Sequence, residues 1–427
     1  MNSPRRSFLT AAVSLGAAPY FIPATAFGKN GAVAPSNRIA MGFIGVGGMG
    51  SNNLRAFIKD ERVQPVAICD VDSARRAAAL ETAKLGTAAG FNDFREVTGR
   101  DDIDAVMIAT PDHWHAIITC TAARAGKDIY CEKPLSLTVR EGRIVADTVA
   151  RHERVLQVGT WRRSRAACRK ASELVRNGRI GKVHTVHVGV PDRFGVQGGF
   201  TGREPPEAVP EGFDYSMWLG QCPSRPYTPA RCHHNFRWIT DYSAGYITDF
   251  GAHYLDVVHW ALGADDSGPQ RVSATGEFAG DGIYDAPLQY TIEYSYGETM
   301  VLMRTVPASN QWGMRFEGTD GSIYVENSTI VAQPRELAAQ KIGPGEVHLY
   351  ESVDHHRDFI DRVISPGQTA APVEVGHRSA TACHLGYIAL RVGRKIAWDP
   401  HREQIIGDTA AAQLLSRPMR SPWLLTG

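Results

Sequence analysis

The feature that most constrains the fold is a glycine-rich turn that joins a short apolar run to a helix-like segment. Residues 39–44 are apolar and of strand length, and Gly45, Gly47 and Gly50 follow in the spacing Gly-x-Gly-x-x-Gly. In a strand–turn–helix unit, such glycines make the tight turn, let the backbone approach a pyrophosphate, and let helix and strand pack closely. The pattern predicts dinucleotide contacts at Gly45, Gly47, Met49 and Gly50. The alternative is an ordinary glycine turn of an α/β protein.

An acidic residue supports the dinucleotide interpretation. A second apolar run, residues 63–69, stops at Asp70, about twenty residues after the last glycine. A carboxylate at this strand end accepts hydrogen bonds from ribose hydroxyls and repels a 2′-phosphate, so NAD is the expected cofactor. Arg75 and Arg76 lie close by in the sequence. We interpret both as part of a solvated helix face, and NADP, with its phosphate held by these arginines, is the alternative.

Strands and helices alternate through the first part of the chain. Residues 104–109, 128–131 and 155–158 are mainly apolar runs of strand length, and helix-like segments separate them. This alternation predicts a doubly wound parallel sheet, in which ligands bind beyond the carboxyl ends of the strands. The residues there that we expect to contact the cofactor are Thr110, Pro111, His115, Glu132 and Lys133.

The second half of the chain alternates apolar and polar side chains with a period of two. The alternating segments are residues 182–190, 288–296 and 299–306. They predict a mainly antiparallel sheet with one covered face and one open face. An insert dense in glycine, proline and aromatic residues, 191–241, and a helix over 249–262 separate the first of these strands from the others. The expected fold class is therefore α/β, with a Rossmann domain followed by an α/β domain that carries an open-faced sheet.

Length and composition set the broad limits. A chain of 427 residues is too long for one small core and predicts two domains. We place the dinucleotide-binding domain at 36–160 and a substrate and oligomerisation domain at 161–427. The composition is that of a globular protein, with 43% hydrophobic and 21% charged residues and a net charge of +1. Because there is no long basic run, nucleic acid and an anionic membrane surface are not expected partners.

Residues 1–26 have the layout of an export signal. Arg5 and Arg6 precede a modest apolar run, and Ala24-Thr-Ala26 suits cleavage by a signal peptidase. The apolar run is too short to serve as a membrane anchor. We therefore expect a periplasmic protein exported by the twin-arginine route, and a basic, disordered N-terminus is the alternative. Because that route carries folded proteins and the periplasm has no free nicotinamide pool, the cofactor is expected to be tightly bound.

The cysteines argue against a disulfide framework. There are seven, and no two stand in a Cys-x-x-Cys pattern. Most lie in strand or helix patterns typical of small core residues. Cys222 and Cys232 flank a proline-rich loop, and they are the candidates for a pair formed after export.

Lys133 is the first candidate for chemistry. It stands at the carboxyl end of a predicted parallel strand, between Glu132 and Pro134. A lysine at this place can reach a substrate hydroxyl or carbonyl and stabilise developing negative charge. The proline fixes the local backbone and removes a donor, which favours this role over that of a surface lysine at a strand end.

Asp249 and His253 form the second candidate group. They are four residues apart at the predicted start of a helix, so we expect both side chains on one face. An imidazole suits the removal of a hydroxyl proton, and Asp249 would orient it. Asp256 is either a second orienting group or a cap contact. One alternative is a core histidine beside an N-capping aspartate. The other is a metal site completed by His233 or His234, which we set aside because the ligand set is poor in oxygen.

Aromatic, basic and amide side chains form a third group. Sugars are bound by hydrogen bonds to their hydroxyls and by stacking on flat apolar faces, and these side chains supply both. The alternative is a structured loop in which the aromatic rings pack together and the arginines are solvated. The residues that we expect to bind substrate, besides Asp249 and His253, are Trp161, Arg162, His234 and Asn235.

Taken in order, these motifs resemble the Gfo/Idh/MocA oxidoreductase family over nearly the whole predicted mature chain. The resemblance rests on the glycine turn with its acid, Thr110-Pro111 with His115, Glu132-Lys133-Pro134, and Asp249-x-x-x-His253. It implies catalysis by Lys133, Asp249 and His253 on a sugar or polyol hydroxyl, and a homo-oligomer formed through the open sheet face. The exported members include glucose–fructose and aldose oxidoreductases that hold their cofactor tightly.

The resemblance leaves the reaction open between alternatives. Glucose–fructose oxidoreductase typically has tyrosine where His253 stands, which argues against that reaction. Another exported branch hydrolyses glycosides through transient oxidation by NAD, but it commonly lacks the lysine that this chain keeps as Lys133. We expect a dehydrogenase that transfers a hydride between a sugar or glycoside and the cofactor. An NAD-dependent glycosidase is the first alternative, and a non-catalytic sugar-binding protein with structural NAD is the second.

Overall fold

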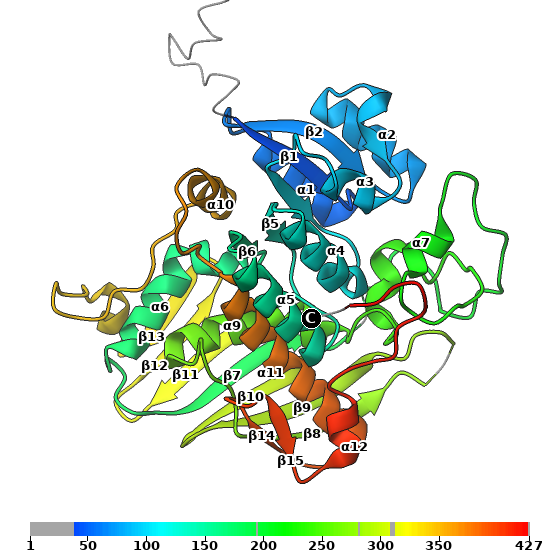
Figure 1. Cartoon of the computed structure of the whole chain (residues 1–427). Coiled ribbons are helices and arrows are strands. Elements are labelled where there is room, and N and C mark those ends of the chain that lie inside the picture. Colours follow the sequence, from blue (N-terminus) through cyan, green and yellow to red (C-terminus); the bar gives the residue numbers. More distant parts are fainter. Residues whose placement is uncertain (1–37, 194, 281, 308–311, 426–427) are drawn as a thin grey trace, which may run out of the picture. The chain divides into compact units, whose positions relative to one another are not determined.

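The computed structural model describes residues 38–193, 195–280, 282–307 and 312–425. Within it, Ile39–Gly427 forms one compact unit. The export signal expected at residues 1–26 lies outside the described residues. Two sheets organise the described part of the chain, one of six strands and one of nine (Figure 1).

The first sheet is parallel throughout and has the strand order β3-β2-β1-β4-β5-β6. This is the Rossmann order, and the doubly wound sheet expected from the sequence is confirmed. The order reverses between β1 and β4, which is the point where such sheets bind a dinucleotide. Its strands are β1 (Ile39–Ile44), β2 (Val63–Cys69), β3 (Gly90–Phe91), β4 (Ala105–Ile108), β5 (Asp128–Cys131) and β6 (Leu156–Val158). Its helices are α1 (Gly48–Phe57), α2 (Ser73–Ala83), α3 (Phe94–Thr98), α4 (Asp112–Arg124) and α5 (Val139–Arg151).

The second sheet is mainly antiparallel, and one pair, β7 with β10, is parallel. Its order is β13-β12-β11-β7-β10-β9-β8-β14-β15. The first strands are β7 (Val183–Pro191), β8 (Arg271–Phe278), β9 (Pro287–Tyr296), β10 (Thr299–Val306) and β11 (Gly313–Gly318). The others are β12 (Ser322–Glu326), β13 (Thr329–Gln333), β14 (Ile396–Asp399) and β15 (Gln404–Ile406).

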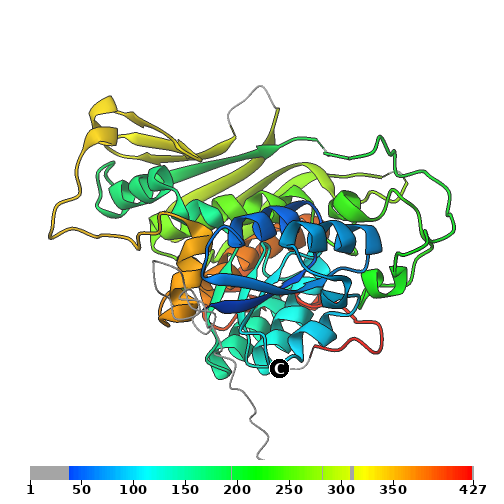
Figure 2. The same cartoon turned by 90° about the horizontal axis from the view of Figure 1, so that it is seen from above.

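The period of two on these strands is explained by a layer of helices on one face. Tyr290, Ile292 and Tyr294 of β9 are buried toward that layer, whereas Gln289 and Glu293 are exposed. The helices are α6 (Ala166–Arg176), α9 (Gly251–Leu262) and α11 (Val373–Val392), which pack on the strands and on one another. Seen from above, the opposite face of the sheet carries no helix among the described residues (Figure 2).

The helix expected over 249–262 is broken at Phe250. α8 (Tyr246–Asp249) ends before it, and α9 begins at Gly251. The main-chain N–H of His253 donates to the Phe250 carbonyl oxygen (3.1 Å), so the carbonyl of Asp249 is left without the helical bond it would otherwise accept. The remaining short helices are α7 (Tyr215–Leu219), α10 (His355–Ile364) and α12 (Thr409–Gln413).

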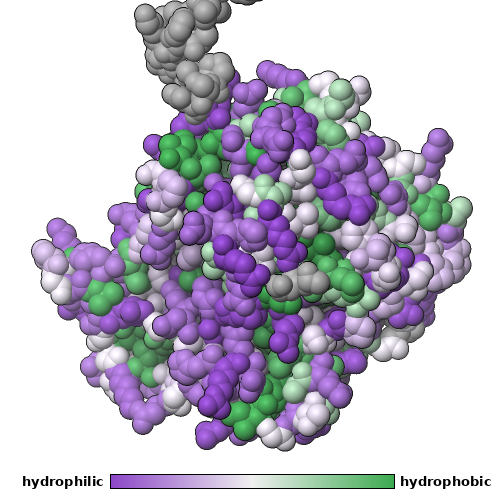
Figure 3. Space-filling view, in the orientation of Figure 1, coloured by the Kyte–Doolittle hydropathy of each residue, from purple (hydrophilic) through white to green (hydrophobic). Residues whose placement is uncertain are grey.

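Hydrophilic residues dominate the face seen in Figure 3, and hydrophobic residues reach this surface in separate patches. Within the described residues, no helix has both the length and the apolar character needed to span a bilayer. Three core clusters, two on the faces of the first sheet and one on the second sheet, contain most of the buried hydrophobic side chains of the described residues, and a smaller fourth cluster lies mainly in the insert.

A buried ion cluster fixes the start of the second domain to α9. Arg163 donates from Nε to Asp256 (2.9 Å) and from Nη2 to Asp265 (2.6 Å), and its side chain is only 3% exposed. Asp256 is fully buried, and its carboxylate contacts Arg163. The role expected for Asp256, a second group orienting His253, is therefore wrong, because this carboxylate is used by the ion cluster.

We predict that Asp256→Ala destabilises the protein by about 3 kcal/mol, because it leaves a buried guanidinium with one partner fewer. The free energy of unfolding, measured by denaturant titration, tests this. Glu298→Ala, which removes an exposed partner of Lys182, is the control and should leave the unfolding midpoint nearly unchanged. A loss of activity at unchanged stability would instead place Asp256 in the active site.

Candidate active site

A cavity of about 280 Å³ lies beyond the carboxyl ends of β1, β2, β4 and β5. Its walls come from both domains. The Rossmann side includes Gly45, Gly47, Met49, Asp70, Thr110, Pro111, His115, Glu132 and Lys133. The opposite side comes from the insert and includes Gln197, Phe213, Met217, Trp218, His233, His234, Phe236 and Arg237. Gly50, the remaining residue expected to contact the cofactor, lies just behind this lining.

The glycine turn has no room for side chains at the positions where the motif has glycine. Gly45 has a φ of +78°, and a Cβ at Gly50 would come within 1.9 Å of the Gly45 carbonyl oxygen. At Gly47 a Cβ would point at the guanidinium of Arg75, on the cavity side. Gly47 also caps α1, and no side chain satisfies the first N–H groups of that helix. The turn and the open helix start therefore suit a pyrophosphate.

Asp70 connects the ends of the first two strands. Its Oδ2 accepts from the Val46 N–H and its Oδ1 from the Asp72 N–H, both at 2.9 Å. Burial raises the pKa of this carboxyl above its ordinary value, and the two N–H donors oppose the shift. The carboxylate lines the cavity and keeps lone pairs for ribose hydroxyls, as expected for an NAD site.

The two arginines after β2 are not the solvated helix face that we expected. Arg75 lines the cavity, with its Nε 3.6 Å from Asp72. Arg76 donates from Nη1 to the carbonyl oxygen of Asp70 at 2.5 Å. Arg75 is therefore in a position to meet a nucleotide, whereas Arg76 holds the strand end.

His115 connects two strand ends. Its Nδ1 lies 2.7 Å from the Pro134 carbonyl oxygen, and its Nε2 lies 2.9 Å from that of Thr110. Each nitrogen thus faces a main-chain carbonyl oxygen. Burial lowers the pKa of the ring, and the neutral ring donates to one of the two oxygens. The histidine contributes its ring to the cavity wall and positions the turn that carries Lys133.

Glu132 is buried behind the lysine. Its Oε1 accepts from Nδ2 of Asn53 (2.9 Å), and its Oε2 accepts from the main-chain N–H of Lys133 (3.3 Å). Burial raises its pKa, and the neighbouring Lys133 opposes the shift. Asn53 in turn faces His356 of α10 at 3.0 Å. A polar chain therefore runs from α10 through α1 to the backbone of Lys133.

Lys133 and Asp249 meet across the two domains. The Lys133 ammonium donates to Asp249 Oδ1 at 2.5 Å and to the Asp249 carbonyl oxygen at 3.0 Å, the carbonyl freed by the helix break. Arg237 approaches the same Oδ1 with its Nε at 3.4 Å. Burial would raise the pKa of Asp249, but the two cations outweigh it and hold the pKa well below its usual range. The carboxylate is therefore ionised throughout the neutral range.

His253 lies one turn beyond this ion pair. It is 9% exposed, its ring meets that of Trp161 edge-on at 5.7 Å, and its Nδ1 has no hydrogen-bond partner among the described residues. Burial, together with Lys133 and Arg162, lowers its pKa well below the ordinary value, so the ring is neutral at neutral pH. Asp249 contacts Lys133 and not His253, which differs from the orienting role that we expected. Neither Asp249 nor His253 is part of the described cavity lining.

The expected substrate-binding residues divide into two groups. His234 lines the cavity, but the side chain of Asn235 forms two hydrogen bonds with the main chain of Gln197, at 2.9 Å each. Arg162 is buried in an ion pair with Glu326 (2.9 Å), outside the described cavity lining. The guanidinium groups of Arg162 and Arg165 lie over the ring of Trp161 in cation–π contacts. Of these four residues, His234 is thus the one placed to meet a ligand directly in this cavity.

Sequence reasoning missed several residues of the cavity wall. Gln197 and Met217 come from the insert, and Asp112 begins α4 directly after Pro111. Asp112 accepts from Ser243 Oγ at 2.6 Å, and burial raises its pKa to about 6. The sequence signal for Asp112 is its position directly after Thr110-Pro111, at the carboxyl end of a predicted strand. No group of three or more metal-ligating side chains occurs in the part of the chain that the structure describes.

The cysteines are all free, buried thiols in the structure. Cys222 donates to the Asp241 carbonyl oxygen at 3.1 Å, and burial raises the pKa of both Cys222 and Cys232. The structure therefore contains no disulfide between Cys222 and Cys232.

We predict that Gly50→Ala lowers the affinity for NAD at least about tenfold, because the added methyl would displace the Gly45 carbonyl and open the turn. Calorimetric titration with NAD measures this. Gly86→Ala is the matched control, because its Cβ would meet nothing within 4 Å. Equal affinities for the two variants would show that the turn does not bind the nucleotide.

We predict that Asp112→Asn changes the pH dependence of stability. The unfolded carboxyl ionises near pH 3.8 and the folded one near pH 6, so the folded state binds the extra proton and wild-type stability falls as pH rises through this window. Asparagine can still accept from Ser243 but does not ionise. The variant should gain on the order of 2–3 kcal/mol relative to wild type between pH 4 and pH 7.

Denaturant titrations at several pH values measure that difference. Asp101→Asn, at an exposed position, is the control and should follow the wild-type curve. A constant difference between Asp112→Asn and wild type across the window would contradict the prediction.

Comparison with known proteins agrees with this geometry. Residues 39–160 match the model of the oxidoreductase family's NAD-binding Rossmann fold, and residues 164–425 match that of the family's C-terminal alpha/beta domain. The inositol 2-dehydrogenase of Salmonella typhimurium is 30% identical over 148 residues, which cover 34% of this chain and 44% of that enzyme. The chain thus spans less than half the length of this relative.

Two further proteins extend the comparison. The alpha-N-acetylgalactosaminidase of Shewanella oneidensis is 37% identical over 158 residues, 34% of each chain. The aldose–aldose oxidoreductase of Caulobacter crescentus, solved with glycerol, has a TM-score of 0.63 at 17% identity, with 84% of this chain and 99% of that one covered. At that identity the likeness shows the fold. Together with the two matching models, these findings show that the chain belongs to the Gfo/Idh/MocA family of oxidoreductases.

Proposed function

We propose that this protein is a periplasmic oxidoreductase that transfers a hydride between a sugar or glycoside hydroxyl and a tightly bound NAD. The observation that carries the proposal is that Lys133, which lines a cavity that suits a dinucleotide, is held by an ion pair with Asp249 behind the lining. When bound, NAD supplies the hydride acceptor. The residues of the chain bind the substrate, orient its hydroxyl and receive its proton.

Lys133 is suited to orient the reacting oxygen. An ammonium group has three N–H donors, and Asp249 accepts two of them. Because Lys133 lines the cavity, the third donor is available to a substrate oxygen there. Two fixed acceptors hold the ammonium in one place, which is the preorganisation that electrostatic stabilisation requires.

His253 is suited to receive the proton. The ring is neutral, since its pKa is lowered, and a neutral imidazole accepts a proton from a hydroxyl. Ionised Asp249 lies four residues before it and favours the positive charge that the ring gains. His234, Gln197 and Arg237 on the insert supply donors and acceptors for the other hydroxyls of a sugar.

Export and cofactor retention belong to the same proposal. The paired arginines and the Ala24-Thr-Ala26 segment support a twin-arginine signal, and folded export favours a cofactor that leaves the cytoplasm already bound. The cavity walls come from both domains, which supports slow release of that cofactor. The uncovered face of the second sheet, with Met300 and Leu302 partly exposed, supports assembly into a homo-oligomer.

A glycosidase that uses NAD as a built-in oxidant is the second candidate. The similarity to the N-acetylgalactosaminidase of Shewanella oneidensis favours it. Product analysis separates the two candidates. An oxidised sugar supports the dehydrogenase, and a released, unoxidised sugar with no net redox change supports the glycosidase.

We predict that Lys133→Met lowers kcat about 10²–10³-fold, because it removes the donor to the reacting oxygen. The purified protein is assayed against a panel of sugars by the absorbance of reduced nicotinamide. Asp249 keeps Arg237 as a partner in this variant, so the fold and the bound nucleotide should persist.

The matched control is Lys182→Met, at an exposed lysine whose loss should leave kcat unchanged. Mass spectrometry of the nucleotide released on denaturation shows whether both variants carry the cofactor. Turnover by Lys133→Met within about threefold of wild type would exclude the role proposed for Lys133.

A further inference from the structure

The wall of the cavity next to Asp70 and Asn92 is apolar and aromatic. Phe94, Trp114 and Met217 line it. Phe94 and Trp114 meet edge-to-face at 5.4 Å, and Met217 comes from α7 in the insert. Because Asp70 marks the ribose end of a dinucleotide site, this wall faces the adenosine half of the nucleotide.

Trp114 joins the Rossmann domain to the insert. Its indole Nε1 donates to the carbonyl oxygens of Met217 and Trp218, both at 3.1 Å. Gly220, directly after α7, packs so closely on the indole that a Cβ there would come within 2.4 Å of the ring. The insert is also fixed at the other side of the ribose end, where Asn92 donates to Asp214 at 2.9 Å.

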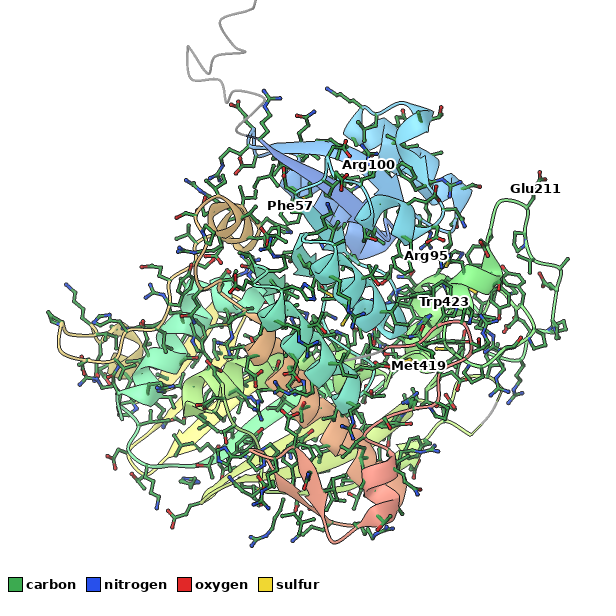
Figure 4. The ribbon with its side chains drawn as sticks, in the orientation of Figure 1. Phe57, Arg95, Arg100, Glu211, Met419 and Trp423 are labelled. Carbon is green, nitrogen blue, oxygen red and sulfur yellow. The ribbon has the colours of Figure 1, made fainter. Side chains whose placement is uncertain are left out.

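The C-terminal segment, residues 417–425, lies on the outer side of this wall. Trp423 packs edge-on against Trp114 at 4.8 Å and lies 6.2 Å from the ring of Phe94. The guanidinium of Arg95, next to Phe94, covers Trp423 at 5.1 Å. Figure 4 shows Trp423 below Arg95, on the same C-terminal segment as Met419.

Arg420 fixes the same segment to α7. Its Nε donates to the Gly220 carbonyl oxygen (2.9 Å) and its Nη2 to that of Ser216 (3.1 Å). Gly220 is the C-cap of α7, and Ser216 lies in its first turn, so Arg420 contacts the helix at two places. Its main-chain N–H donates to the Gln221 carbonyl oxygen at 2.8 Å. Arg420 therefore holds the helix that supplies Met217 to the cavity.

We propose that the C-terminal segment 417–425 retains the nucleotide, with Trp423 and Arg420 as its positioning residues. They touch no ligand and act through Trp114 and α7, which form the wall against the adenosine half. Opening that half of the cavity requires Trp114 to separate from α7, and the segment packs across both. The inference rests on the proposed function in that it takes the bound ligand to be NAD.

The experiment measures how fast NAD leaves the holoprotein, by exchange with labelled NAD in excess. Trp423→Ala should raise the dissociation rate about tenfold, because it removes the aromatic contact behind the wall. Arg420→Gln should raise it in the same direction while it leaves the aromatic cluster intact. The matched control is Leu424→Ala, at a neighbouring side chain that is 70% exposed, and its rate should equal that of wild type.

A purely structural role for Trp423 would change the unfolding midpoint and leave the dissociation rate of the folded protein unchanged. Equal dissociation rates for Trp423→Ala, Arg420→Gln and Leu424→Ala overturn the inference, whatever the sugar activity. Failure of the proposed function is a different result, in which the protein binds NAD and oxidises no sugar. In that case faster release from Trp423→Ala still supports the retaining role.

Discussion

The ion pair between Lys133 and Asp249 is the contact on which the arrangement of the site depends. It joins a lysine at the end of a Rossmann strand to an aspartate of the second domain, and both side chains are largely buried, at 10% and 16% exposure. A buried pair of this kind adds little net stability, because desolvation of the two charges offsets their attraction. Separating the partners, in contrast, leaves two charges uncompensated. The pair therefore specifies how the two domains meet more than it stabilises the fold.

The break between α8 and α9 makes this contact possible. A continuous helix would use the Asp249 carbonyl oxygen for its own hydrogen bond, whereas here Lys133 takes it. Gly251, the first residue of α9, packs within 3.3–3.4 Å of Cys383 and Met303 at its would-be Cβ position. A larger residue would press on α11 and β10. The glycine thus lets α9 start close to the sheet. Asp249 is then placed so that its main-chain carbonyl oxygen and its carboxylate both face Lys133.

Much of the Rossmann domain could be predicted because its signals are local. The glycine turn, the acid after β2 and the strand ends follow from short segments, and all of them lie where a nucleotide site requires. The role of Asp249 could not be derived in the same way. The rule that residues four apart share a helix face assumes an unbroken helix, and the chain breaks it at Phe250.

The insert shows a second limit of local reasoning. Within residues 233–238, His234 and Arg237 face the cavity, while Asn235 binds the main chain of Gln197. The 3₁₀ path of residues 233–238 decides which side chains point inward, and no periodicity in the sequence indicates it. Arg75 likewise reaches the cavity because Gly47 leaves space for its guanidinium. Such contacts depend on segments that are far apart in the sequence.

The protonation states around the pair follow from one physical cause. Burial raises the pKa of Asp112 and Glu132 and lowers that of His253, and each shift favours the neutral form. Asp249 is the exception, because the two cations that face it lower its pKa and keep its carboxylate ionised. A neutral imidazole that gains a proton beside a fixed carboxylate gains an attractive interaction that it lacked before. The two members of the ion pair act on the histidine in opposite directions, since Lys133 disfavours the charged ring and Asp249 favours it.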